Sequence, residues 1–144
     1  MKDGTSVSWA QWLFLVAAVV EAATGLGLIV VPEVVVKLLF GGDLSGVGFA
    51  IGRIAGFALL SIGLLCWMGR REPGNLPILA SMFSYNLPVT LYLAYLGIGG
   101  VAVGPLLWPT VAFHAVMTIL FAACVKAQVG RAGTGSRHSQ RGSR

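Results

Sequence analysis

The stretch that decides the fold is residues 13–31, LFLVAAVVEAATGLGLIVV, in which Glu21 is the one charged side chain of an otherwise apolar run. A helix of about 20 apolar residues crosses the roughly 30 Å of hydrocarbon in a bilayer. A helix also satisfies its own backbone hydrogen bonds, as lipid requires. The stretch therefore predicts a transmembrane helix with a carboxyl group near its middle. Its length and Glu21 argue against a cleaved signal peptide.

Three further stretches have the same character. The four predicted spans are residues 10–31, 47–68, 76–97 and 105–126. Of the 144 residues, 56% are hydrophobic and 10% are charged, whereas soluble domains carry about 25% charged residues. The alternating pattern of a membrane β-barrel is absent. We therefore predict an all-α membrane protein, a four-transmembrane-helix bundle that forms one domain over residues 1–129.

The two remaining segments have distinct compositions. The first connection contains Pro32 and ends in Gly41-Gly42, a pattern typical of a helix start and a helix end. It predicts a short interfacial helix in the first outer loop, with Val35, Leu38 and Leu39 turned inward, and a simple connector is the alternative. The C-terminal segment 130–144 is rich in Gly, Ser and Arg, a composition that predicts a disordered basic tail.

Basic residues predict the orientation. Four spans place the N-terminus, the 69–75 loop and the C-terminal tail on one side of the membrane. That side holds most of the basic residues: Lys2, Arg70, Arg71, Lys126, Arg131, Arg137, Arg141 and Arg144. The positive-inside rule then predicts a multi-pass protein of the inner (plasma) membrane with both termini in the cytoplasm. We expect the tail to determine topology or to contact anionic lipid, and we expect no nucleic-acid partner.

Each predicted span carries one strongly polar residue, namely Glu21, Arg53, Asn86 or His114. A charge at the centre of a bilayer costs at least about 2.5–3.5 kcal/mol on insertion scales. A rise of 1.5 Å per residue places Glu21, Asn86 and His114 about 15–18 Å from the cytoplasmic ends of their helices, and Arg53 about 24 Å. One polar layer is therefore predicted, with a buried ion pair between Glu21 and Arg53 at its centre.

Other polar side chains extend this layer. Thr110, His114 and Thr118 share one helix face at i,i+4 spacing, and Tyr85 precedes Asn86. The candidate ligand-binding or polar-network residues are Glu21, Arg53, Tyr85, Asn86, Thr110, His114 and Thr118. Two readings stay open: a network that only fixes packing, or a pocket that binds a small or lipidic ligand or relays protons.

The sequence offers little support for catalysis. Glu21 and His114 are two metal ligands, too few for a zinc site, so we predict no metal and no cofactor. No nucleophile with an oriented base is visible, which leaves a membrane enzyme with Glu21 and His114 as acid and base as an alternative. Cys66 and Cys124 form no Cys-x-x-Cys motif, so we expect buried, inert thiols. A membrane partner or a second copy of the chain stays open.

Short signatures in the first half of the chain resemble a known family. They are Glu21-Ala-Ala-Thr-Gly-Leu-Gly27, Val31-Pro-Glu33, Leu38-Leu-Phe-Gly41 and Gly52-Arg-Ile-Ala-Gly56. This order resembles small bacterial four-helix membrane proteins of the DoxX-like kind, many of them uncharacterised. The resemblance implies a four-helix bundle with a redox-linked or accessory role in the membrane, and it supplies no catalytic residues.

A second resemblance rests on Glu21 alone. Small multidrug-resistance transporters are also four-helix proteins with a lone Glu in the middle of the first helix, where the carboxylate exchanges protons for a cationic drug. This resemblance implies a proton-coupled small-molecule transporter. Two features argue against it: Arg53 would compete with a cationic substrate, and the basic bias opposes dual insertion.

Overall fold

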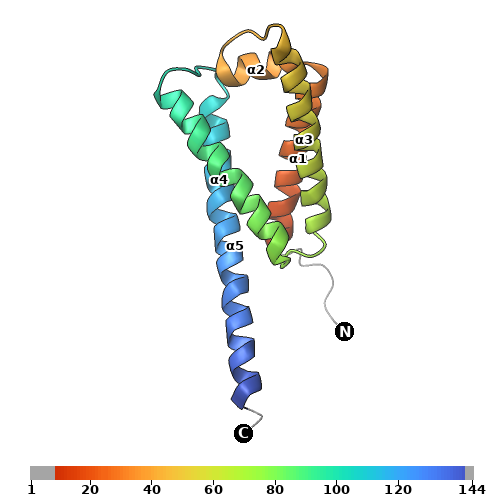
Figure 1. The fold of residues 1–144 in the computed structure, drawn as a ribbon, viewed down its shortest axis with the longest axis vertical. Helices are drawn as coiled ribbons and strands as arrows, with labels where there is room; N and C mark the ends of the chain where they lie inside the picture. The colour runs from red at the N-terminus through yellow and green to blue at the C-terminus, as the bar shows by residue number, and fades with distance from the viewer. Residues whose placement is uncertain (1–8, 142–144) are drawn as a thin grey trace.

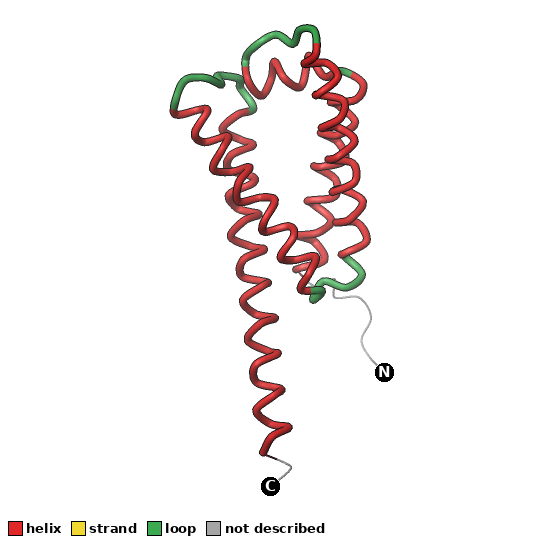
Figure 2. The backbone as a smooth tube through the Cα atoms, in the orientation of Figure 1, coloured by secondary structure: helices red, strands yellow, loops and turns green. Residues whose placement is uncertain are grey.

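The computed structural model describes residues 9–141, with side chains described from residue 9 to residue 131. The described chain folds into helices alone (Figure 1, Figure 2). They are α1 (Trp9–Val30), α2 (Pro32–Phe40), α3 (Val47–Gly69), α4 (Leu76–Ile98) and α5 (Leu107–Arg141). Four of them, all except α2, are long and apolar enough to cross a membrane. The predicted all-α fold with four transmembrane helices is confirmed.

The long helices form two pairs that pack along their length, α1 with α3 and α4 with α5, with few contacts from one pair to the other (Figure 1). Small residues bring α1 and α3 together. A Cβ atom added to Gly25 would lie 2.7 Å from the carbonyl oxygen of Gly56, and one added to Gly56 would lie 2.7 Å from the carbonyl oxygen of Gly25. Close backbone approach of this kind is how small residues associate membrane helices.

The two pairs meet at the end of the bundle that holds the N-terminal end of α1. There, buried side chains from all four long helices form one core, including Phe14, Leu79, Met82 and Phe121. The rings of Phe14 and Phe121 pack edge to face with centroids 5.4 Å apart. The predicted burial of both cysteines is confirmed, and the Cys66 thiol lies 3.4 Å from the sulfur of Met82. This core closes the bundle at one end.

Helix α2 closes the other end. Pro32 occupies its first turn, where a missing N–H costs nothing, and Gly41 ends it in the left-handed conformation with φ 79°. The helix lies across the ends of the long helices and joins the two pairs (Figure 1). The backbone N–H groups of Val103 and Leu106 donate to the carbonyls of Phe40 and Leu38. The predicted short helix is therefore present, and main-chain bonds clamp it to the α4–α5 loop.

The C-terminal segment differs from the prediction. Helix α5 continues without a break to Arg141 and extends well beyond the other helices (Figure 2), whereas the composition predicts a disordered tail from residue 130. Nucleation is the costly step in helix formation, and each added residue then costs little. A segment of low propensity can therefore continue a helix that the apolar residues before it have already formed. Residues 142–144 of the predicted tail lie outside the described residues.

The outer surface of the helices is apolar over the length that would contact lipid. Large side chains such as Ile54, Leu91 and Ile119 are more than half exposed, as expected where lipid rather than water surrounds the helices. Exposed Trp and Tyr rings lie toward both ends of the bundle, namely Trp9, Trp12 and Trp67 at one end and Tyr92, Tyr95 and Trp108 at the other. This distribution is typical of the two interfaces of a membrane.

Candidate functional site

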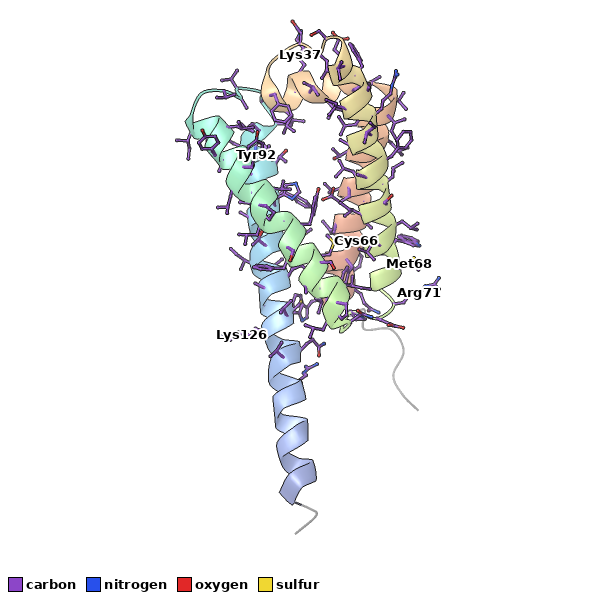
Figure 3. The ribbon with its side chains drawn as sticks, in the orientation of Figure 1. Lys37, Cys66, Met68, Arg71, Tyr92 and Lys126 are labelled. Atoms are coloured by element: carbon purple, nitrogen blue, oxygen red, sulfur yellow. The ribbon has the colours of Figure 1, made fainter. Side chains whose placement is uncertain are left out.

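A cavity of about 750 Å³ lies between the two helix pairs beneath α2. Residues from all five helices line it, and most are aliphatic, such as Val35 and Leu39 of α2 and Val89 of α4. Val35, Leu38 and Leu39, which were predicted to turn inward, all line the cavity, and Leu38 is also 39% exposed. The polar side chains in the lining are Glu21, Thr24, Tyr85, Thr110 and His114. Figure 3 labels Tyr92 of α4, whose side chain is 62% exposed.

Glu21 meets a tyrosine across the cavity. Its side chain is 3% exposed, and its Oε2 accepts a hydrogen bond from the Tyr85 hydroxyl at 3.0 Å. Glu21 comes from α1 and Tyr85 from α4, so this bond joins the two helix pairs. Gly25 and Ala18, which flank Glu21 on the same helix, pack against α3.

His114 is held from behind by Asn86. The distance from His114 Nδ1 to Asn86 Oδ1 is 2.8 Å. The amide nitrogen of Asn86 donates to the Met82 carbonyl at 2.8 Å, which fixes Oδ1 as the atom facing the imidazole. Nδ1 must then be the donor, because Oδ1 can only accept. In the neutral ring this leaves Nε2 as an acceptor with a free lone pair.

Two acceptor atoms of this cluster have no partner among the described residues: Glu21 Oε1 and His114 Nε2. Every side-chain nitrogen or oxygen that is completely buried within the described part of the chain has a hydrogen-bond partner. Oε1 and Nε2 must therefore be reachable from open space, and both residues line the cavity. The Tyr85 ring lies beside the imidazole, with centroids 5.8 Å apart, so Tyr85 contacts both residues.

A second group of polar side chains lies in the seam between α4 and α5. Thr90 donates to the Asn86 carbonyl and Thr118 donates to the His114 carbonyl, each at 2.8 Å. The two hydroxyl oxygens are 3.5 Å apart. Asn86, Thr90 and Thr118 are absent from the cavity lining. They join the helices and position His114, and sequence reasoning had not singled out Thr90.

The predicted ion pair between Glu21 and Arg53 is wrong. Arg53 is exposed, and its Nε donates to the Ile29 carbonyl at 3.4 Å. The reason is the position of Arg53 around the helix axis. Gly52 contacts Pro32 and Gly56 contacts α1, so these two glycines mark the packed face of α3. Arg53 follows Gly52 by one residue and therefore points outward. Within the described side chains, the ion pair found is Lys37 with Asp43, at 3.1 Å on the surface.

The remaining predicted site residues divide between cavity and seam. Glu21, Tyr85, Thr110 and His114 line the cavity, and Asn86 and Thr118 stand behind it. Thr24 was missed as a site residue, although it follows Glu21 by three positions and so shares its helix face. Pro88 lies inside α4 without ending it.

The chemistry available to the site is acceptor-rich and largely apolar. Residues 9–131 contain no group of three His, Cys, Asp or Glu side chains that could hold a metal ion. The cavity offers a carboxyl group, an imidazole nitrogen and the hydroxyls of Thr24 and Thr110 within an aliphatic surround. Such a lining favours binding a molecule with an apolar body and a small polar head.

Comparison with protein-family models, with curated proteins and with solved structures finds no match. The resemblances to DoxX-like proteins and to small multidrug-resistance transporters stay predictions.

Proposed function

We propose that this protein is an integral membrane protein that binds a small amphipathic or lipidic molecule in its intramembrane cavity. The observation that carries the proposal is the pair of unpartnered acceptors, Glu21 Oε1 and His114 Nε2, in a cavity of about 750 Å³ lined mostly by aliphatic side chains. Ligand pockets range from about 300 to 1,000 Å³ and combine apolar walls with a few placed polar groups.

A purely structural network explains less of this arrangement. Packing alone accounts for Asn86, Thr90 and Thr118, because Asn86 bonds to His114 and the two threonine hydroxyls lie 3.5 Å apart in the seam between α4 and α5. It does not account for a carboxyl group and an imidazole that each keep one acceptor toward open space. Polar atoms that face a largely apolar cavity without partners are costly, which favours an arrangement that a ligand or ordered water completes.

We further propose that the protein lies in the inner (plasma) membrane with both termini in the cytoplasm. Arg70, Arg71 and Lys126 lie toward the end of the bundle opposite α2, and Lys37 lies on α2 itself (Figure 3 labels Lys37, Arg71 and Lys126). The positive-inside rule supports the cytoplasmic assignment of the Arg-rich end. The cavity would then lie in the outer half of the membrane, beneath α2.

Filling the cavity tests the binding function. Val89 lines the cavity from α4, and Leu91 of the same helix is 62% exposed on the outside. We expect Val89→Trp to occupy the cavity and Leu91→Trp to leave it intact. Native mass spectrometry of protein purified from its membrane in mild detergent should show a co-purified molecule with the parent chain and with Leu91→Trp, and should show none with Val89→Trp. The proposal would be refuted if the parent chain carried no co-purified molecule and also bound no added alkyl probe.

Proton-coupled transport is a second candidate function, and one observation favours it. Arg53 faces away from the cavity and contacts the Ile29 carbonyl, so it does not compete with a cationic substrate for Glu21. Reconstituted vesicles with a pH gradient provide the test. Transport predicts that accumulation of a substrate follows the gradient and stops in Glu21→Gln, whereas a binding protein without transport shows no accumulation in either form.

A further inference from the structure

We infer that the cavity selects amphiphiles whose head group donates hydrogen bonds, an ammonium ion above all, and that it rejects anionic head groups. This inference rests on the proposed binding function and adds the chemical class of the ligand. Its basis is the inventory of free atoms. His114 Nε2 is an acceptor, and Glu21 Oε1 is an acceptor when the carboxyl group is ionised, the state that a bound ammonium ion favours. Two acceptors on either side of Tyr85 require donors on the molecule between them.

Two hydrogen bonds within the protein already use the donors of Tyr85 and His114. The Tyr85 hydroxyl already donates its proton to Glu21, and the Nδ1 proton of His114 is used by Asn86. The hydroxyls of Thr24 and Thr110 can donate or accept as the ligand requires. They add hydrogen bonds for either kind of head group, so the carboxyl group and the imidazole decide the preference.

Charge distinguishes an ammonium head group from a hydroxyl head group. The cavity lining, as described, contains the Glu21 carboxyl group and no Lys or Arg side chain. Lys37 is engaged with Asp43 on the outer surface, and Arg53 is exposed. A carboxylate in a low-dielectric surround binds an ammonium ion more strongly than a hydroxyl, because the hydrogen bond is charge-assisted. The same carboxylate repels a fatty acid or phosphate head.

The shape of the cavity supplies the other half of the ligand. The aliphatic side chains of α2, of α3 and of the loop between them, including Leu39, Ile51 and Leu44, cover the space beyond the polar cluster. They favour an alkyl or cyclic hydrocarbon body through burial of apolar surface. The ligand class is therefore an amphipathic amine or alcohol with an apolar body.

A matched set of probes tests the inference. Dodecylamine, 1-dodecanol and dodecanoate share one chain and differ in the head group. Their binding to the purified full chain in nanodiscs can be measured by native mass spectrometry with Val89→Trp as the blocked control. We expect affinity to fall in the order amine, alcohol, carboxylate. We expect Glu21→Gln to weaken amine binding by at least about tenfold.

Glu33→Gln is the matched charge control, because Glu33 is exposed on α2 and does not line the cavity. It should leave the amine affinity unchanged. Equal binding of all three probes, or tightest binding of dodecanoate, would overturn the inference while the binding function stands. The ranking in the parent chain needs no variant, so it decides the question even if Glu21→Gln fails to fold. Absence of binding by every probe would refute the inference and the proposed function together.

Discussion

Replacing Tyr85 with Phe removes a single oxygen atom at the point where the two helix pairs meet in the cavity. The hydroxyl donates to Glu21 Oε2 at 3.0 Å, which is an ordinary hydrogen-bond length. The aromatic ring remains, so its edge-to-face contact with His114 is retained. The change therefore tests one hydrogen bond between α1 and α4 and leaves the packing in place.

The expected cost follows from the surroundings of the carboxyl group. Leaving a buried acceptor without its donor costs about 1–3 kcal/mol. Glu21 adjoins the cavity, so water can reach Oε2 once the hydroxyl is gone, which favours the lower end of that range. Side-chain hydrogen bonds in membrane proteins average about 0.6 kcal/mol and reach about 1.7 kcal/mol in double-mutant cycles. We expect Tyr85→Phe to lower the free energy of unfolding by on the order of 1 kcal/mol.

The assay is a double-mutant cycle with Glu21→Leu, read by circular dichroism during unfolding in detergent micelles titrated with dodecyl sulfate. Leu is chosen because Gln would still accept from the tyrosine. Tyr92→Phe is the matched control, since Tyr92 lies on the same helix and is 62% exposed. A coupling energy near 1 kcal/mol is expected for the Tyr85–Glu21 pair. Additive effects, or an equal loss in Tyr92→Phe, would refute the assignment of this bond as a link between the helix pairs.

Three other predictions address packing, the α2 clamp and orientation. Gly56→Ala should destabilise the fold by about 1–3 kcal/mol through overpacking, because the added Cβ would lie 2.7 Å from a carbonyl oxygen of α1. Gly42→Ala is the control: its added Cβ would have no atom within 4 Å, so it should be neutral in the same unfolding assay. Gly104→Ala should detach α2, since its Cβ would overlap the carbonyl end of that helix, and faster thiol labelling of a cysteine placed in the cavity would show this. In intact cells, Lys37→Cys should react with an impermeant maleimide, whereas Arg71→Cys should react only after permeabilisation; the reverse pattern would overturn the proposed topology.

The sequence predicted the helices well because hydrocarbon allows few solutions for an apolar segment. The observed α1, α3 and α4 begin and end within a residue of the predicted spans. The short α2 was predictable too, since Pro32 and Gly41 mark its two ends. The end of α5 was not predictable in this way. Composition indicates the local preference of a segment, whereas continuation of a helix depends also on the residues that precede the segment.

The sequence predicted which residues form the candidate site better than it predicted the contacts between them. Depth along the helix indicated that Glu21, Asn86 and His114 share a layer, and the structure brings Tyr85 to Glu21 and Asn86 to His114. Rotation about the helix axis was the missing information. Arg53 follows Gly52 by one residue, a turn of about 100°, and that turn takes it from the face that packs to the face that is exposed.

The separation in sequence between Glu21 and Tyr85 gives the chain an order of assembly. They are 64 residues apart, so α1, α2 and α3 are synthesised and can pair through their glycines before the helix with the hydroxyl emerges. During that interval the carboxyl group has no donor from α4, and the arrival of Tyr85 supplies one to Oε2. A chain interrupted after α3 would keep an unsatisfied carboxyl group within the membrane, a mark by which an unfinished copy differs chemically from a finished one.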